Sequence, residues 1–252
     1  MSLPSIIPFL PMDIFLCKST SISRTSTILD TCETILVTSL VLISLLTSSP
    51  FKNVLWCSSN LIYIDSGATY RCVALQCLRN NIKLEETDKI IQLTKTLDIN
   101  FDEQQRTFLN GEDVSSLIRS KEVTAIVSQI SSIVEVREIL VDLQRKMSLG
   151  KNVIMEGRDI TTVVFPNADF KFYLDASVEE RANRRFKQNR EMNINTSMEE
   201  IIENIKMRDY NDMHKPVGAL VRTDDQIYID STHMTIDEVV TFIVNEINKN
   251  TR

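Results

Sequence analysis

The sequence predicts an α/β fold in which helices cover both faces of a mostly parallel sheet. Two observations carry this prediction. Four short apolar runs each end in a polar turn, and a helical stretch follows each of them. Three of these helical stretches open with a hydroxyl residue followed three positions later by glutamate, the pattern of a capping box. Strands that alternate with capped helices are typical of parallel sheets with two covered faces.

The predicted strands cover residues 61–64, 153–155, 170–174 and 226–229. The predicted helix starts are Ser177 with Glu180, Ser197 with Glu200, and Thr235 with Glu238. Residues 97–101 and 106–110 alternate between apolar and polar side chains, as the two arms of a small hairpin do. We expect this hairpin to be an insertion outside the main sheet.

Composition narrows the possible functions. The 252 residues are 43% hydrophobic and 25% charged, with a net charge of −6, which suits one large domain or one domain with an insertion. The acidic balance argues against binding to nucleic acid or to an anionic membrane, although local arginines can still hold a small anion. Five cysteines without a framework spacing predict reduced thiols in a cytosolic protein, and two histidines are too few to predict a metal site.

The first sixty residues differ from the rest of the chain. They contain no glycine and six charged residues, and serine, threonine, leucine and isoleucine dominate. Residues 35–46 form an apolar run, but a membrane-spanning helix needs about 20 such residues. We interpret the run as a buried strand or helix, with a membrane anchor as the alternative.

Polar clusters follow the first two predicted strands, at residues 65–71 and 156–159. Ligands of doubly wound sheets gather at the carboxyl ends of the strands. Arg71 and Arg158 offer planar forks for phosphate, and Asp159 can accept hydrogen bonds from a base or a sugar. Gly67 and Gly157 would let the backbone approach a ligand closely.

Further arginines lie on the later helices. Arg181, Arg184 and Arg185 share one helical face, and Arg208 lies four residues before Asp212. Each group alone also fits a solvated basic face or a surface ion pair, so both interpretations remain open.

These segments resemble the bacterial-type cytidylate kinases, a family of nucleoside monophosphate (NMP) kinases. Residues 63–71 resemble the family's Asp-(Ser/Thr)-Gly-Ala-x-Tyr-Arg segment, and residues 110–115 its Gly-Glu-Asp-Val segment, with Ile118, Arg119, Glu122 and Val123 following. Residues 156–166 resemble its Gly-Arg-Asp segment, residues 175–185 the start of its lid, and residues 229–232 its last strand. The resemblance covers about residues 61–250. It implies a P-loop-type NMP kinase fold with an NMP-binding region at about 83–147 and a lid at about 176–216.

The resemblance implies ATP- and Mg²⁺-dependent phosphorylation of CMP or dCMP in pyrimidine nucleotide metabolism. By position, the residues that hold the monophosphate are Ser66, Arg71, Ser128, Arg137, Arg158, Asp159, Arg208 and Asp212. The arginines would grip the phosphate, while Ser128, Arg158 and Asp159 would read the cytosine and Asp212 the sugar. Arg181, Arg184 and Arg185 would close over the donor phosphates as a lid, with Arg158, Asp159, Arg181 and Arg185 in catalytic positions. We expect a cytoplasmic monomer that binds these nucleotides and neither nucleic acid nor membrane.

One part of the family pattern is missing. The family begins with a strand and a G-x-x-G-x-G-K-[ST] loop whose amides and lysine hold the donor phosphates. The lysine should stand roughly 17 residues before Asp65, at Ser48, where this chain has Leu-Thr-Ser-Ser-Pro and no glycine. Thr161 also replaces a family glycine, and Lys215 an arginine. We therefore expect very weak turnover or none.

Three explanations of the first sixty residues remain open: a mistranslated or wrongly joined start, a genuine start of a CMP-binding pseudo-kinase, or reuse of the fold as an interaction module. The abrupt change of composition near Asn60 favours the first. A UMP or AMP kinase would share the fold, but the Gly-Arg-Asp and Gly-Glu-Asp-Val segments favour cytidine. The family's first strand is central, so its loss exposes apolar edges unless residues 35–46 replace it.

Overall fold

The computed structural model describes residues 12–17, 61–102, 104–191 and 194–250. Its main sheet has five strands in the order β2 (Leu61–Asp65), β6 (Asn152–Gly157), β1 (Met12–Cys17), β7 (Phe170–Asp175) and β8 (Ile227–Asp230). β2, β6, β7 and β8 are the four strands predicted from the sequence, and they all run in one direction. The prediction of a mostly parallel sheet is confirmed.

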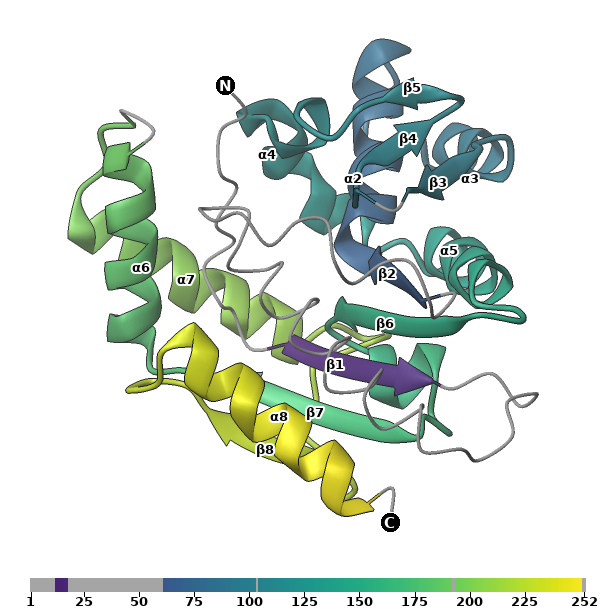
Figure 1. Ribbon diagram of the computed structural model, residues 1–252. Helices are drawn as coiled ribbons and strands as arrows, with labels where there is room; N and C mark the ends of the chain where they lie inside the picture. The colour runs from purple at the N-terminus through teal and green to yellow at the C-terminus, as the bar shows by residue number, and fades with distance from the viewer. Residues whose placement is uncertain (1–11, 18–60, 103, 192–193, 251–252) are drawn as a thin grey trace.

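The central strand β1 runs against the other four (Figure 1, purple). Asp13 at its start lies opposite Gly157 on β6 and Tyr173 on β7, so β1 begins at the edge of the sheet where its neighbours end. The sequence left open whether residues 35–46 replace the family's central strand; in the structure β1, a six-residue segment, pairs with both inner edges. Residues 35–46 themselves lie outside the described residues.

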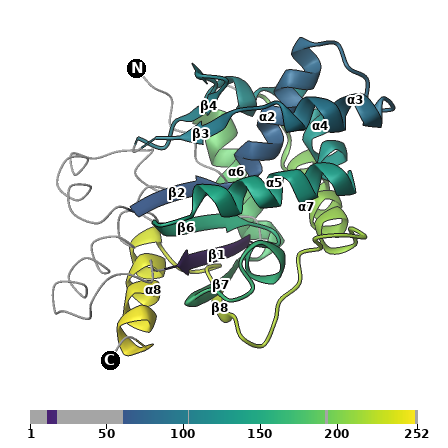
Figure 2. The same cartoon turned by 90° about the vertical axis from the view of Figure 1, so that its right-hand side faces the viewer.

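Helices cover both faces of the sheet, as predicted (Figures 1 and 2). The helix α8 (Ile236–Asn250) packs on one face, where its Ile243 joins Phe172 of β7 and Ile154 of β6. The helix α5 (Val134–Met147) packs on the other face against Val153, the neighbour of Ile154. Adjacent residues of a strand point to opposite faces, so β6 is covered on both sides.

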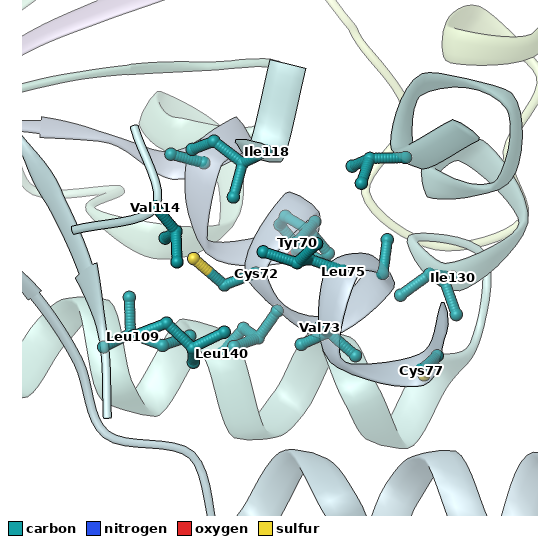
Figure 3. Packing of buried hydrophobic residues seen from close by; sticks show 14 of the residues in the cluster. Tyr70, Cys72, Val73, Leu75, Cys77, Leu109, Val114, Ile118, Ile130 and Leu140 are labelled. Atoms are coloured by element: carbon teal, nitrogen blue, oxygen red, sulfur yellow. The ribbon is translucent and has the colours of Figure 1, made fainter. Parts of the chain in front are cut away.

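A second unit of structure is inserted between β2 and β6. It contains α2 (Ser66–Arg79), α3 (Thr87–Lys95), the 3₁₀ turn η1 (Leu117–Arg119), α4 (Lys121–Ile130) and α5. Its small sheet joins β3 (Ile99–Phe101), β4 (Thr107–Leu109) and β5 (Glu112–Asp113), so the predicted hairpin is confirmed and gains a third strand. Figure 3 shows its core, in which the α2 residues Tyr70, Cys72 and Val73 pack against Leu109, Ile118 and Leu140.

The helices α6 (Val178–Glu191) and α7 (Met198–Met213) form a pair beside the sheet (Figure 1). All three predicted helix starts are confirmed, because Ser177, Ser197 and Thr235 each accept a hydrogen bond from the backbone N–H three residues later. At Thr235 the glutamate also accepts from the cap residue, which completes the capping box.

Two of the five cysteines have described side chains. Cys72 and Cys77 are buried and free, in agreement with the prediction of reduced thiols, and burial raises the pKa of Cys72 to about 12. No helix of the described residues is both long and apolar enough to cross a membrane.

Candidate active site

The site forms where β2 and β6 end side by side. Asp65 and Glu156 are direct neighbours in the parallel register, and α2 begins immediately after Asp65. The Asp65 Oδ1 atom accepts a hydrogen bond from the Ala68 N–H at 3.0 Å and so caps the helix. This capped strand-to-helix turn aims the first turn of α2 and Arg71 at the carboxyl edge of the sheet.

Gly157 allows two segments of the chain to approach each other. A Cβ atom at this position would collide with the Ser66 hydroxyl and would lie 2.6 Å from Cδ1 of Ile160. The sequence predicted that Gly157 makes room for a ligand, and the structure shows that it makes room for Ser66. Ser66 is therefore buried at the base of the site, with 5% of its surface exposed.

Arg137 and Asp159 form a buried ion pair. Arg137, on α5, also donates to the Ser131 carbonyl oxygen at 3.0 Å, and only 6% of its side chain is exposed. Burial raises the pKa of Asp159, and the attraction of Arg137 opposes this shift. The pair brings two predicted site residues, 22 positions apart in sequence, into contact, but its charges compensate each other.

Asp212, near the end of α7, is surrounded by cations. It accepts hydrogen bonds from Arg158 Nε at 2.9 Å and from Lys215 Nζ at 2.8 Å, and Arg208 Nε lies 3.9 Å away. Burial alone would raise the pKa of Asp212, but Arg158, Lys215 and Arg208 outweigh it and lower the pKa below its usual value. Of the two interpretations left open for Arg208 and Asp212, a simple surface pair does not fit, because Arg158 and Lys215 bind the same buried carboxylate.

Arg71 faces the same region from α2. Its guanidinium donates to the Ile118 carbonyl oxygen at 3.1 Å and to the Thr124 hydroxyl at 2.9 Å. Burial lowers the pKa of Arg71; Asp65 opposes this shift, whereas the guanidinium groups of Arg119, Arg185 and Arg158 strengthen it. Several cations therefore converge at this edge, which is the electrostatic requirement for binding a phosphate.

Ser128 lies on α4, with an exposed side chain. Its carbonyl oxygen accepts from the Ser131 hydroxyl at 2.9 Å, and the Lys215 ammonium donates to that hydroxyl at 3.3 Å. Ser128 is thus connected to Asp212 through Ser131 and Lys215.

The three arginines of α6 are held differently. Arg181 is buried, and its guanidinium binds both carboxylate oxygens of Asp209 on α7, at 3.0 and 2.7 Å. Arg184 donates to Glu180 at 2.8 Å and to the Ser231 carbonyl oxygen at 2.7 Å. Arg185 is the member of the group that interacts electrostatically with Arg71. Arg181 therefore joins α6 to α7, while Arg185 donates a hydrogen bond to Gln188 of its own helix at 3.0 Å.

The structure adds residues that the sequence reasoning did not place in the site. Glu156 is buried and hydrogen-bonds to Tyr63, and burial together with Asp65 raises its pKa to about 7. Gly218 has φ +66°, and a Cβ there would collide with Arg137 and lie 2.6 Å from Oδ2 of Asp159. Only the isolated glycine of the Lys-Pro-Val-Gly segment could have signalled this contact from the sequence.

Thr161 and Gln226 hydrogen-bond to each other in the interior, joining the short π-helical turn η2 (Ile160–Val164) to the start of β8. Thr161 is 2% exposed, so the position where the family has glycine is filled by a buried, hydrogen-bonded side chain.

Comparison with known proteins agrees with this geometry. The cytidylate kinase family model matches residues 52–249. A cytidylate kinase of Caldanaerobacter subterraneus subsp. tengcongensis is 47% identical over 190 residues, which are 75% of this chain and 84% of that protein. One of Clostridium perfringens (strain SM101) is 46% identical over 75% of this chain and 87% of its own length. One of Leuconostoc mesenteroides is 41% identical over 80% of this chain and 92% of its own length. This chain belongs to the cytidylate kinase family.

Proposed function

We propose that the chain binds CMP or dCMP as a phosphoryl acceptor, with the γ-phosphoryl group of ATP as the group that the family transfers. The observation that carries this proposal is the grouping of Arg158 and Arg208 around the buried Asp212 carboxylate, with Arg71 near enough to interact electrostatically with both arginines. Positioned cations and fixed hydrogen-bond acceptors are what phosphoryl transfer needs from a protein. The names of the 41–47% identical relatives support the same acceptor.

Asp159 is the residue that we assign to the cytosine edge, with Arg158 and Ser128 beside it. A carboxylate accepts hydrogen bonds from the exocyclic amino group of cytosine, a donor that uracil lacks. Arg137 is buried and already bound to Asp159, so we assign it the role of orienting this carboxylate rather than gripping phosphate. Asp212 would bind the sugar hydroxyl, with Arg158 and Lys215 holding its orientation.

The sequence lacks the loop with which the family binds the donor phosphates. The chain has five glycines, at positions 67, 111, 150, 157 and 218, and none of them belongs to a G-x-x-G-x-G-K-[ST] loop. Arg185, and Arg181 and Arg184 if they exchange their present partners, are the lid residues that could meet ATP. We propose that this chain binds the acceptor and transfers phosphate very weakly or not at all, so that a CMP-binding pseudo-kinase is the second candidate.

Mg²⁺ would arrive with ATP. Among the described residues, no group of three histidine, cysteine, aspartate or glutamate side chains is placed to hold a metal. Nucleotide kinases usually bind Mg²⁺ through substrate phosphates and one or two carboxylates, so the phosphates of ATP would supply most of its ligands. Bound Mg²⁺ would neutralise charge on the donor phosphates.

We also propose a cytoplasmic monomer that acts on nucleotides and not on nucleic acid. The net charge of −6 supports the second point, and the free, buried thiols of Cys72 and Cys77 support a reducing compartment.

Calorimetric titration of the full-length protein with CMP, dCMP, UMP and AMP tests the acceptor assignment. We expect CMP and dCMP to bind at least about tenfold more tightly than UMP and AMP. Uracil presents a carbonyl oxygen to the Asp159 carboxylate in place of the cytosine amino group, and a purine is larger than the pyrimidine of CMP. Equal affinity for all four nucleotides, or no binding of CMP, would contradict the assignment.

A further inference from the structure

Arg119 is a further cation close to Asp65, and no role in the acceptor site has been assigned to it. It ends the turn η1 in the inserted unit, and 34% of its side chain is exposed. Its NH2 atom lies 3.5 Å from Oδ2 of Asp65, longer than a normal hydrogen bond between these groups. Asp65 caps α2 through its other oxygen, so the cap does not depend on Arg119.

Arg119 is connected to Arg71 by a hydrogen bond to the neighbouring backbone. The carbonyl oxygen of Ile118, the preceding residue, accepts a hydrogen bond from Arg71 at 3.1 Å. Burial is the main cause of the lowered pKa of Arg71, and Asp65 opposes it. Arg119 lowers this pKa further, as do Arg185 and Arg158. Like charges so close repel each other, and an anion between them would relieve that repulsion.

Two other cations of the region, Arg137 and Lys215, are more firmly held. Arg137 is bound to Asp159, and Lys215 is bound to Asp212 and Ser131. Lys215 also lacks the planar fork of the family arginine that it replaces. Arg119 and Arg208, with ion-pair contacts of 3.5 and 3.9 Å, are the guanidinium groups with the loosest partners in this set.

We propose that Arg119 is a phosphate-binding residue of the acceptor site, which leaves Asp65 and joins Arg71 and Arg158 on the monophosphate when the nucleotide binds. The inference rests on the proposed acceptor function. Because Arg119 belongs to the inserted unit and Arg158 to the main sheet, the shared phosphate would draw the two units together. Arg119 would then supply the bidentate contact that Lys215 cannot make.

The test compares Arg119→Met with Arg79→Met in the full-length protein. Arg79 is a matched control, because its side chain is also 34% exposed and also pairs with a carboxylate, Glu112. Each variant is titrated with CMP and with cytidine, which lacks the phosphate. We expect Arg119→Met to weaken CMP binding by about 10- to 100-fold and cytidine binding by less than about twofold. Arg79→Met should leave both affinities within about twofold of the wild type.

Arg119→Lys separates charge from geometry and protects the test against a folding defect in Arg119→Met. It should recover part of the CMP affinity while cytidine binding stays unchanged. Unchanged CMP binding in both Arg119 variants, or an equal loss for CMP and cytidine, would overturn the inference and leave the proposed function standing. A wild-type protein that binds cytidine but gains no affinity from the phosphate would overturn both.

Discussion

The acceptor side and the donor side of this kinase-family chain are built in different ways. The proposed acceptor side is assembled from single residues on several elements, such as Arg71 on α2, Asp159 after β6 and Asp212 on α7. The donor side of the family depends on one continuous loop after the central strand. In this chain the central strand is β1, which starts at the carboxyl edge of its neighbours, with Asp13 opposite Gly157, and runs away from it.

The two sides should respond differently when the segment that normally carries the phosphate loop is changed. A loop that cradles phosphate must leave a strand at the edge where the ligand binds, and a reversed strand delivers the following residues to the opposite edge. Scattered residues keep their positions as long as their own strands and helices form. We therefore expect acceptor binding to persist where phosphoryl transfer is lost. Four experiments test this difference between the two sides.

The largest effect is expected from a new donor segment. Replacing residues 1–60 with a segment that carries the family's strand and G-x-x-G-x-G-K-[ST] loop should raise CMP-dependent ADP release by at least ~10³-fold. A matched chimera with the loop lysine changed to methionine is the control. Equal rates of ADP release in the two chimeras and the full-length chain would contradict the view that the missing loop limits phosphoryl transfer.

The next effect concerns the buried pair on the acceptor side. Arg137→Met leaves the Asp159 carboxylate buried without its partner, and should lower the free energy of unfolding by about 3–5 kcal/mol. Arg79→Met removes an exposed pair and should cost less than about 1 kcal/mol. Urea denaturation of both variants at pH 7 measures the difference. Similar costs for the two would show that the Arg137–Asp159 pair is not buried as described.

The free energy of unfolding should depend on pH through Glu156, the buried carboxyl group next to Asp65. Its pKa is about 7 in the folded protein, raised first by burial and then by Asp65, while Arg119 and Arg158 oppose the shift. A raised pKa favours the protonated folded state, so this contribution is complete below about pH 4.5 and is lost as the pH rises through 7. Relative to Glu156→Gln, the wild type should lose roughly 3 kcal/mol of unfolding free energy between pH 4.5 and 8. Parallel pH profiles for the two proteins in urea denaturation would refute the shift.

The smallest effect separates backbone strain from steric contact. Gly218 and Gly150 have φ of +66° and +69°, but a Cβ meets Arg137 and Asp159 at the first and nothing within 4 Å at the second. Gly150→Ala should cost about 1 kcal/mol of unfolding free energy, and Gly218→Ala about 2–3 kcal/mol together with weaker CMP binding. Thermal denaturation and CMP titration check both. Equal costs and an unchanged CMP affinity would mean that Gly218 does not shape the site.

Several residues of the candidate site could be located from the sequence because their signals are local. The end of β2 at Asp65 and the turn after β6 that holds Asp159 are marked by a change from apolar to polar residues, and helix starts such as Ser197 by their capping pattern. The family resemblance supplied the remaining residues, and the structure brings Arg158 and Asp212 into contact across 54 positions.

The rest depends on contacts that no local pattern records. β1 is a six-residue segment, less apolar and shorter than the run at residues 35–46, and it becomes a strand only because two neighbouring strands offer it hydrogen bonds. In the same way, the contact of Gly218 with Arg137 and the approach of Arg119 to Asp65 arise only when distant segments fold together.

The most direct test of the central claim is the rate of ADP release by the full-length protein with ATP, Mg²⁺ and CMP, measured against a control without CMP. The proposal of an acceptor side that binds CMP without a working donor side predicts no CMP-dependent release above the control, in protein that binds CMP by calorimetry. Turnover in the range of about 1–100 s⁻¹, which is typical of kinases, would contradict it.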